Sequence, residues 1–296
     1  MNPQNNAASI VIPSYNNKAG LEKVLNAMLQ LNFAGEYEII VVDDGSTDGT
    51  KEMLIQKFKK EKKISLIFFE NNQGVCKARN AGIAKTQFSI VINMDHDCVP
   101  GKNWLTEMIA GFDSEKIGIV TGYGGYGGTS TGFRKKLLEK VHGYDETYRY
   151  YREDTDLAFK IMELGYELSY IKAKYNPLER DLNLSGWKNK FKYLGKRLRY
   201  HMNDVLLYKK HPTKRCEEFL KIKFGFLVSP KWDFNIATGT WENNKKMTLS
   251  SPRGINFLEN KSFAHFVLIV FIGLLYVFCV KLARLTGSIR FGKLLV

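Results

Sequence analysis

The sequence predicts an α/β fold in which a mostly parallel sheet is flanked by helices. Short apolar runs of strand length recur through the first half of the chain, helical patterns separate them, and polar residues follow several of the runs. This alternation is typical of a parallel sheet covered by helices. A length of 296 residues leaves ample sequence for a core, and 44% hydrophobic with 25% charged residues excludes disorder or a many-spanning membrane protein as descriptions of the whole chain.

The expected strands are short and rich in β-branched residues, and they cover 8–13, 37–43, 64–69, 88–94 and 117–121. Between the first two, Leu21, Val24, Leu25 and Met28 recur at helical spacing, which predicts a helix with one face on the sheet. Further helices are expected from Ser46–Asp48 through about Lys60, over 74–85, and from Glu153–Asp154 to Gly165. The glycine-rich stretch 122–132 predicts a mobile loop.

The composition becomes basic and aromatic from about residue 181. We therefore expect an α/β domain over 1–180, a basic aromatic helical region over 181–258, and a hydrophobic membrane segment with a basic tail over 259–296. The segment Phe263–Val280 carries no formal charge and would measure about 27 Å as a helix, which barely spans a bilayer. It indicates a membrane span or an in-plane anchor, and a buried core helix is the alternative.

The charge balance favours anionic partners. Lys and Arg outnumber Asp and Glu by 44 to 30, a net +14, which suits polyanions, anionic lipid head groups or phosphorylated substrates. Four scattered cysteines give neither zinc-site spacing nor a disulfide framework, so a reducing compartment is the simpler interpretation. The first nine residues lack a signal-peptide pattern. We expect a membrane-associated protein whose α/β domain lies on the cytoplasmic side.

Acidic residues follow two of the expected strands. Asp43 and Asp44 come after the second strand, and Asp95 and Asp97 come after the fourth. Ligands of open α/β sheets bind beyond the carboxyl ends of the strands. Four carboxylates at one edge repel one another unless a cation compensates them, so Mg²⁺ or Mn²⁺ with a nucleoside diphosphate is expected. Neither GxGxxG nor a P-loop is present, which argues against dehydrogenases and P-loop enzymes.

Three side chains, Asp44 among them, suit a nucleotide. Asp44 could accept hydrogen bonds from a base edge, Tyr15 offers an aromatic face, and Arg79 on the third helix could reach a phosphate. Each has a structural alternative: a turn or cap residue, half-buried packing and a surface ion pair, respectively.

Five motifs, in order, resemble those of the family 2 glycosyltransferases of the GT-A fold. They are SIVIPSYN (9–16), VVDDGSTDGT (41–50), NQGVCKARNAGI (72–83), the DxD at 95–97 and HGYDETYRYYREDTDLAFKI (142–161). The resemblance implies a Rossmann-like domain and an inverting transfer of sugar from a nucleotide diphosphate, usually a uridine one, to an acceptor hydroxyl. No QxxRW follows, which argues against a processive polymer synthase.

The resemblance also assigns roles on the donor side. It implies that Pro13 and Tyr15 line the base pocket and that Asp44 binds the base. Arg79 would lie near the base or the diphosphate.

The same resemblance implies that Asp95 approaches the ribose and the metal, that Asp97 ligates Mn²⁺ or Mg²⁺, and that Asp154 is the base that activates the acceptor, with Glu153 beside it. A helix cap is the alternative role for Asp154. The stretch 167–177, expected as one strand, ends in Asn176–Pro177 where the family often has a histidine ligand, so the third metal ligand stays open.

The leading hypothesis is a membrane-associated glycosyltransferase that takes a UDP-sugar and extends a glycan or lipid-linked acceptor. A catalytically silent glycan-binding or assembly subunit is the first alternative. A basic nucleic-acid-binding protein is the second, and it would bind with a steep salt dependence. No recognised nucleic-acid motif is present, so we expect no nucleic-acid partner.

Overall fold

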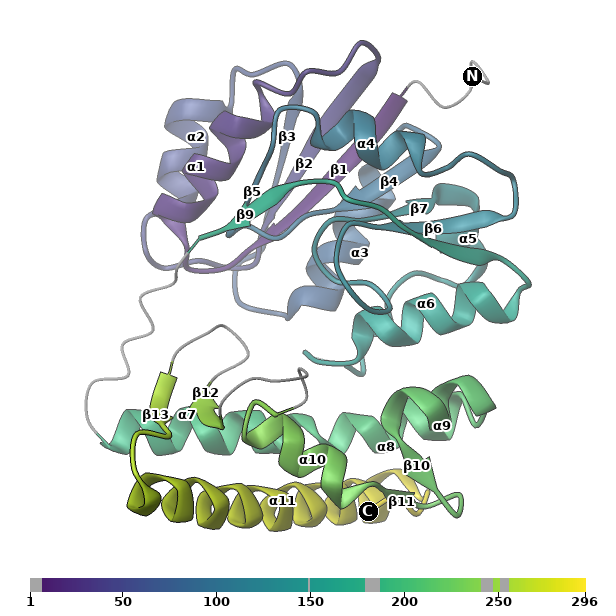
Figure 1. Ribbon diagram of the computed structural model, residues 1–296. Coiled ribbons are helices and arrows are strands. Elements are labelled where there is room, and N and C mark those ends of the chain that lie inside the picture. Colours follow the sequence, from purple (N-terminus) through teal and green to yellow (C-terminus); the bar gives the residue numbers. More distant parts are fainter. Residues whose placement is uncertain (1–6, 149, 179–186, 241–246, 251–255) are drawn as a thin grey trace. The chain divides into compact units, whose positions relative to one another are not determined.

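The computed structural model describes residues 7–148, 150–178, 187–240, 247–250 and 256–296. The chain forms two compact units, residues 1–182 and 183–296, each with its own helices and strands (Figure 1). The domain boundary expected at 180/181 lies outside the described residues.

The first unit is built on a seven-stranded sheet. Its strands are β1 (Ala7–Ser14), β2 (Glu36–Asp43), β3 (Ile64–Phe68), β4 (Ile90–Asn93), β6 (Ile117–Thr121), β7 (Thr131–Arg134) and β8 (Glu167–Tyr170). Their order is β3-β2-β1-β4-β7-β6-β8, and β7 runs antiparallel to both neighbours while the other pairs are parallel. The predicted mostly parallel α/β sheet is therefore confirmed.

The strand order reverses at β1. The chain moves from β1 outward through β2 to β3, and then returns to add β4 on the other side of β1. Such a switch point leaves a crevice at the carboxyl ends of the two strands that flank it, where ligands of α/β sheets bind. The residues after β1 and β4 therefore occupy the position in this fold where a site is expected.

Helices cover both faces of the sheet (Figure 1). They are α1 (Lys18–Met28), α2 (Thr50–Phe58), α3 (Val75–Lys85), α4 (Trp104–Ala110), α5 (Lys135–Lys140) and α6 (Glu153–Glu163). The predicted apolar face of α1 is fully buried in the main core together with Trp104 of α4. Helix α3 packs on the opposite face, where Ala78 meets Ile40 and Val42. A Cβ at Gly82 would lie 2.4 Å from Val11, so glycine lets α3 approach β1 closely.

The single strand expected over 167–177 is two strands. Strand β8 stays in the main sheet, and β9 (Tyr175–Pro177) pairs antiparallel with β5 (Cys98–Pro100). This pairing brings the chain to the DxD segment, because the Leu178 amide donates to the Asp97 carbonyl at 2.7 Å.

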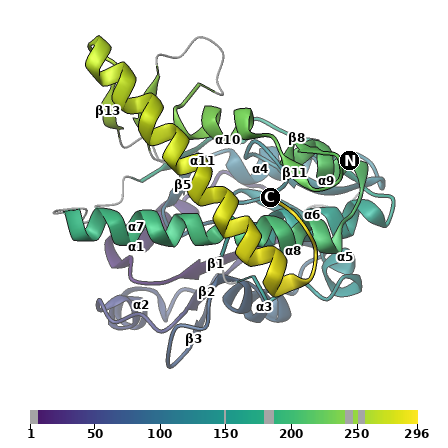
Figure 2. The same cartoon turned by 90° about the horizontal axis from the view of Figure 1, so that it is seen from below.

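The second unit is mainly helical. It contains α7 (Trp187–Tyr200), α8 (Met202–Lys210), α9 (Lys214–Leu220), the hairpin β10 (Ile222–Lys223) and β11 (Leu227–Val228), α10 (Pro230–Ala237), the pair β12 (Thr248–Ser250) and β13 (Asn256–Glu259), and α11 (Phe263–Phe291). Helix α11 packs on α8 and α10, and Figure 2 shows it, in yellow, crossing α8. The apolar segment predicted at 263–280 is thus the first part of a longer helix.

Candidate active site

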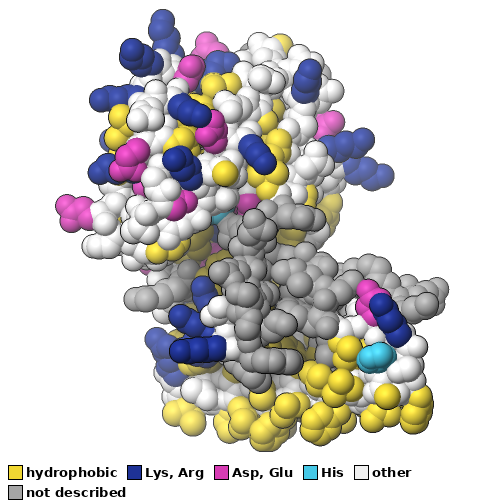
Figure 3. All heavy atoms as spheres, turned by 90° about the vertical axis from the view of Figure 1, so that its left-hand side faces the viewer, with side chains coloured by type: hydrophobic (Ala, Val, Ile, Leu, Met, Phe, Trp, Pro, Cys, Tyr) yellow, Lys and Arg dark blue, Asp and Glu magenta, His cyan; other side chains and the backbone are white. Residues whose placement is uncertain are grey.

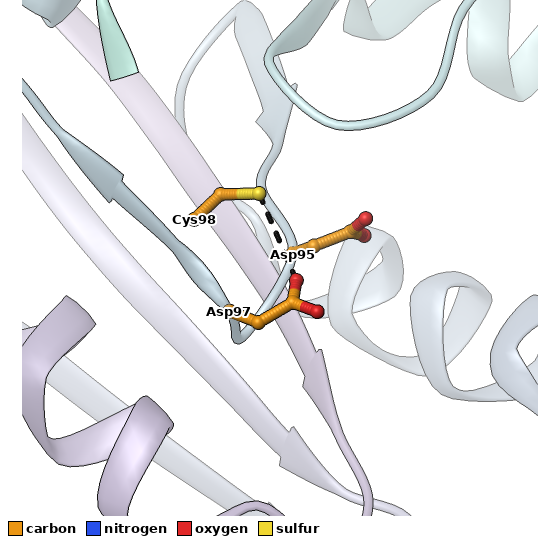
Figure 4. Close-up of side chains that lie close together, drawn as sticks. All are labelled: Asp95, Asp97 and Cys98. Carbon is orange, nitrogen blue, oxygen red and sulfur yellow. Dashed lines mark hydrogen bonds between the residues drawn. The ribbon is translucent and has the colours of Figure 1, made fainter. Parts of the chain in front are cut away.

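The DxD segment forms the turn between β4 and β5. Backbone hydrogen bonds continue the sheet into it, because the Met94 amide donates to the Val11 carbonyl. The Asp95 amide then donates to Thr129 Oγ1 at 3.0 Å. Carboxylate oxygens of Asp95 and Asp97 and the Cys98 sulfur lie within 4.8 Å of one another, and Figure 4 shows both carboxylates on the same side of the turn. The two aspartates expected to share a cation are therefore brought together.

These groups suit a hard divalent cation. Mg²⁺ and Mn²⁺ prefer carboxylate oxygens, and the Asp95 side chain is 38% exposed, so a phosphate-bound ion can approach it. Burial and then the Asp95 charge raise the pKa of the Cys98 thiol to about 12, and a hard cation prefers oxygen to sulfur. In the described part of the chain, no further side chain joins this group, so the third ligand stays open.

Arg79 lies at the centre of the site. Its guanidinium is buried and donates to Asp154 Oδ1 at 2.9 Å and to Asp95 Oδ1 at 3.2 Å. Glu153 Oε1 is 3.6 Å away, and the guanidinium lies over the Tyr144 ring. Arg79 is therefore not a surface ion pair. It joins the aspartate that follows β4 to the two acidic residues that begin α6.

Helix α6 begins after a strained turn. Tyr151 and Arg152 both have left-handed backbone angles, with φ of 74° and 79°, which non-glycine residues adopt at a cost. The turn places Glu153 and Asp154 at the positive end of the helix dipole. Arg152 occupies the N-cap position without a side-chain cap hydrogen bond, and Asp154 Oδ1 accepts from Arg79 and from the Tyr144 hydroxyl. Asp154 therefore lies in the first turn of α6 and not at its cap position.

The two acidic residues that begin α6 lie in different electrostatic surroundings. Glu153 is 4% exposed, and burial followed by the Asp154 charge raises its pKa to about 8. Its Oε2 has no hydrogen-bond partner among the described residues. Burial also raises the pKa of Asp154, but Arg79 and the Tyr144 hydroxyl oppose this effect by stabilising its charge. With a pKa of about 8 Glu153 holds its proton at neutral pH, whereas Arg79 and Tyr144 favour the charged form of Asp154.

Tyr144 is a site residue that the sequence analysis missed. Its buried hydroxyl donates to Asp154 Oδ1 at 3.1 Å and accepts from Asn93 Nδ2 at 2.6 Å. Asn80 fixes the Tyr144 backbone, donating to its carbonyl and accepting from its amide, both at 2.9 Å. The available signal was the position of this tyrosine in the HGYDE stretch ten residues before Asp154.

The glycine-rich loop after β6 touches both halves of the site. Thr129 accepts from the Asp95 amide, and Gly127, with φ of 103°, lies where a Cβ would be 3.2 Å from the Asp154 Cβ. The Tyr126 ring packs edge-on against Phe159 of α6, with centroids 4.8 Å apart. The loop therefore lies against the residues expected to bind metal and to activate the acceptor.

The residues predicted to bind the nucleotide lie at the ends of β1 and β2. Tyr15 is 43% exposed, and its amide donates to His96 Nδ1, which ties it to the DxD turn. Pro13 is buried in β1, two residues beyond Val11, where the pairing with β4 ends. Because proline has no amide hydrogen to donate, its place beyond the end of this pairing leaves no backbone donor without a partner.

Asp44 is buried and holds the loop before α3. Its carboxylate accepts from Asn72 Nδ2 at 2.9 Å and from the amides of Gln73 and Gly74 at 2.7 and 2.9 Å. Burial raises its pKa, and the two amides oppose that rise. The structure thus gives Asp44 a turn-stabilising role, as its structural alternative predicted.

A family model described as Glycosyl transferase family 2 matches residues 9–166. Among curated proteins, the glycosyltransferase AglE of Haloferax volcanii is 33% identical over 115 residues. That match spans 38% of this chain and 38% of the relative's length.

Two solved structures share the fold. A mannosyltransferase from Pyrobaculum calidifontis, in complex with GDP-Man and Mn²⁺, matches with a TM-score of 0.61 and 16% identity, over 94% of this chain and 86% of that one. Residues 1–349 of S. aureus TarS, in complex with UDP, match with a TM-score of 0.50 and 17% identity, over 97% and 92%. The GT-A fold expected from the sequence is confirmed by these similarities.

Proposed function

This chain belongs to glycosyl transferase family 2, and from that premise we propose that it is an inverting, non-processive glycosyltransferase. Its donor is a nucleotide diphosphate sugar, a UDP-sugar in the first instance, and its acceptor is a hydroxyl of a glycan or of a lipid-linked saccharide. The GDP-Man and UDP complexes of its structural relatives support a nucleotide-linked donor for this chain as well. Residues 1–180 would carry donor binding and catalysis.

The observation that carries the proposal is the convergence on Arg79. One guanidinium contacts Asp95, which belongs to the metal side of the site, and Asp154, which belongs to the acceptor side. An inverting transfer needs a base on the face of the sugar opposite the departing diphosphate. The carboxylates of Asp95 and Asp154 lie on two sides of the buried Arg79 guanidinium, which supports such an arrangement.

Asp154 would take the proton of the acceptor hydroxyl. In the described part of the chain, Arg79 and Tyr144 both donate to Oδ1, so Oδ2 is the oxygen left to accept that proton. These two donors hold the carboxylate in place and favour its ionised form. Glu153, protonated at neutral pH, adds no second negative charge beside it.

Asp95 and Asp97 would hold Mn²⁺ or Mg²⁺, and the cation, when bound, stabilises charge on the leaving diphosphate. With Glu153 neutral, Asp95, Asp97 and Asp154 outnumber Arg79 by two charges, which suits a divalent ion. Tyr15 and Pro13 would line the base pocket. Asp44 would bind the base with its carboxylate and would also position the loop 72–74 beside the base.

We further propose that the protein is membrane-associated, with the catalytic unit on the cytoplasmic side. Helix α11 supports this, because it is long and apolar enough to cross a membrane. An acceptor held at a lipid surface would then lie close to the enzyme.

The test uses the purified full chain with a panel of UDP- and GDP-sugars, Mn²⁺ and candidate acceptors, and follows release of the nucleoside diphosphate. Asp154→Asn should lower kcat by about 10²–10⁴-fold while donor affinity is retained. Asp97→Asn should weaken Mn²⁺-dependent donor binding. Asp113→Asn, a change at an exposed aspartate of the same unit, is the control and should have no effect.

Full activity of Asp154→Asn would reject the assigned base. The protein could instead bind saccharide but show neither transfer nor hydrolysis of the sugar nucleotide under any donor and metal condition. That result would reject the enzymatic function in favour of a glycan-binding subunit.

A further inference from the structure

One face of α11 exposes large apolar side chains along its whole length. The exposed residues Phe263, Val267, Phe271, Leu274, Phe278, Leu282, Leu285 and Ile289 follow one another at intervals of three or four. At about 100° per residue, these eight fall within an arc of about 100° on the helix surface. The exposed Phe266, Leu268 and Leu275 widen the apolar face to about 200° in the first half of the helix. The stripe extends well past the uncharged segment that ends at Val280, and it measures about 39 Å at ~1.5 Å per residue.

The opposite face of α11 is packed against protein. A Cβ at Gly273 would lie 2.8 Å from the Phe234 ring of α10, and one at Gly287 would lie 2.9 Å from Val205 of α8. These two close approaches are fourteen positions apart, so α11 is covered on one side over about 21 Å. A helix held this way is not surrounded by lipid.

A charged cluster fixes this packing. Arg284 is 3% exposed, and it donates to both carboxylate oxygens of Asp233 in α10, at 2.6 and 2.9 Å, and to Asp204 in α8 at 3.0 Å. His201 contacts Asp204 and the Tyr276 hydroxyl of α11, each at 3.1 Å. A spanning α11 would draw α8, α10 and these groups toward the hydrocarbon, where each charge costs several kcal/mol.

A second apolar element lies at the end of α11. Phe224, at the tip of the β10–β11 hairpin, is 83% exposed, and Phe226 is exposed beside it. The hairpin is tied to the chain that follows α11, because Val228 donates to the Val296 carbonyl at 2.7 Å and Val296 donates to the Phe226 carbonyl at 2.8 Å. Exposed aromatic side chains of this kind insert readily at a membrane surface.

The positive charge of the protein is concentrated in this unit. Residues 183–296 contain 21 Lys and Arg against 6 Asp and Glu, whereas residues 1–182 contain 23 against 24. The whole net charge of +14 therefore arises in the unit that carries α11. Figure 3 shows hydrophobic side chains gathered along the lower edge of that unit, with Lys and Arg side chains nearby. Anionic head groups complement such a surface.

We propose that α11 does not span the membrane but lies in its plane, with the exposed stripe and the hairpin tip inserted among the lipids of an anionic leaflet. The stripe is longer than the ~30 Å thickness of a hydrocarbon core, and it has one apolar side instead of a continuous lipid-facing surface. This inference rests on the membrane association proposed above, but not on the transfer reaction.

The first test is flotation of the full chain with vesicles of phosphatidylcholine alone or mixed with phosphatidylglycerol, without donor or acceptor. Binding should require phosphatidylglycerol. The double variant Phe271→Asp/Phe278→Asp should bind about 10- to 100-fold more weakly. The matched control Ile55→Asp/Leu164→Asp changes exposed apolar residues of the other unit and should bind normally.

The second test measures depth. In a Cys279→Ser background, in which Cys76, Cys98 and Cys216 remain buried, the variants Phe263→Cys, Phe271→Cys, Phe278→Cys and Leu285→Cys each receive an environment-sensitive dye. Lipids with nitroxides at shallow or deep acyl positions then quench the dye. An in-plane helix gives the same shallow depth at all four sites. A depth maximum near the middle would show a span and overturn the proposal.

Two further outcomes would also overturn it. In one, the Phe271→Asp/Phe278→Asp variant binds the vesicles as tightly as the unmodified chain does. The other is concentration-dependent dimerisation through the stripe, measured by light scattering, with no binding to vesicles. Because neither test requires turnover, a failed transferase assay and a failed membrane assay remain distinguishable. Circular dichroism of each variant checks that it folds.

Discussion

Replacing Arg79 by methionine should destabilise the protein in a pH-dependent way. The substitution keeps an unbranched side chain of similar length, but it removes the only positive charge among the described residues that contact Asp95, Glu153 and Asp154. Arg79 is 3% exposed, so solvent cannot replace the lost charge. Breaking a buried ion pair by removing one partner typically costs about 3–5 kcal/mol.

The cost should depend on the protonation of Asp154. Burial already raises its pKa, and without Arg79 that pKa rises further. A native-state pKa above the unfolded value means that the folded protein holds an extra proton in this window, so the stability of the variant decreases as pH rises. Near pH 5 Asp154 can be protonated, and the cost falls to the ~1–3 kcal/mol of unmatched hydrogen-bonding groups.

Urea unfolding at about pH 5 and pH 8.5 measures this difference. For a unit of 182 residues, the high-pH loss corresponds to a Tm lowered by roughly 6 to 20 °C. Arg134→Met is the matched control: this buried arginine donates mainly to the carbonyls of Ile117 and Ser114, so its loss should cost the same at both pH values. An equal cost for Arg79→Met at the two pH values would refute the electrostatic reasoning.

Three further changes test the site. Tyr144→Phe removes a donor to Asp154, so kcat should fall about 10-fold and the acidic limb of the pH–rate profile should move upward. Glu153→Gln should leave stability unchanged below about pH 4.5 but raise it by a few kcal/mol at about pH 9 in urea unfolding, because the wild-type pKa rises from 4.5 to about 8 on folding. Gly127→Ala, strained at φ of 103°, should lower activity, whereas Gly124→Ala, with open space around it, should not.

Much of the first unit could be predicted because its signals are local. The apolar runs at 37–43 and 117–121 became β2 and β6 with little change in their bounds, and the helical spacing from Leu21 to Met28 became α1. The pairing partners were not predictable in this way. The division of 167–177 into β8 and β9 depends on a long-range pairing with β5, which leaves no periodic signal in either segment.

The sequence predicted which residues form the site but not how they contact one another. The motifs identified Arg79, Asp95 and Asp154, yet no sequence pattern indicates that one guanidinium contacts both carboxylates. Tyr144 was missed because a buried tyrosine resembles ordinary core packing until its hydroxyl partner is known. The orientation of α11 was equally hidden in its first part, since Ile269 and Val280 of the packed face are as apolar as the residues of the exposed stripe.

The glycine-rich loop has a practical consequence for anyone who wishes to redesign this protein. Of its glycines, Gly124 has ordinary backbone angles and nothing within 4 Å of an added Cβ, whereas Gly128 would meet the Tyr123 ring at 3.1 Å. Mutagenesis of this loop should therefore begin at Gly124 and at the neighbouring Tyr123, whose side chain is exposed. Substitutions at the remaining glycines of the loop would mostly disturb its backbone or its packing.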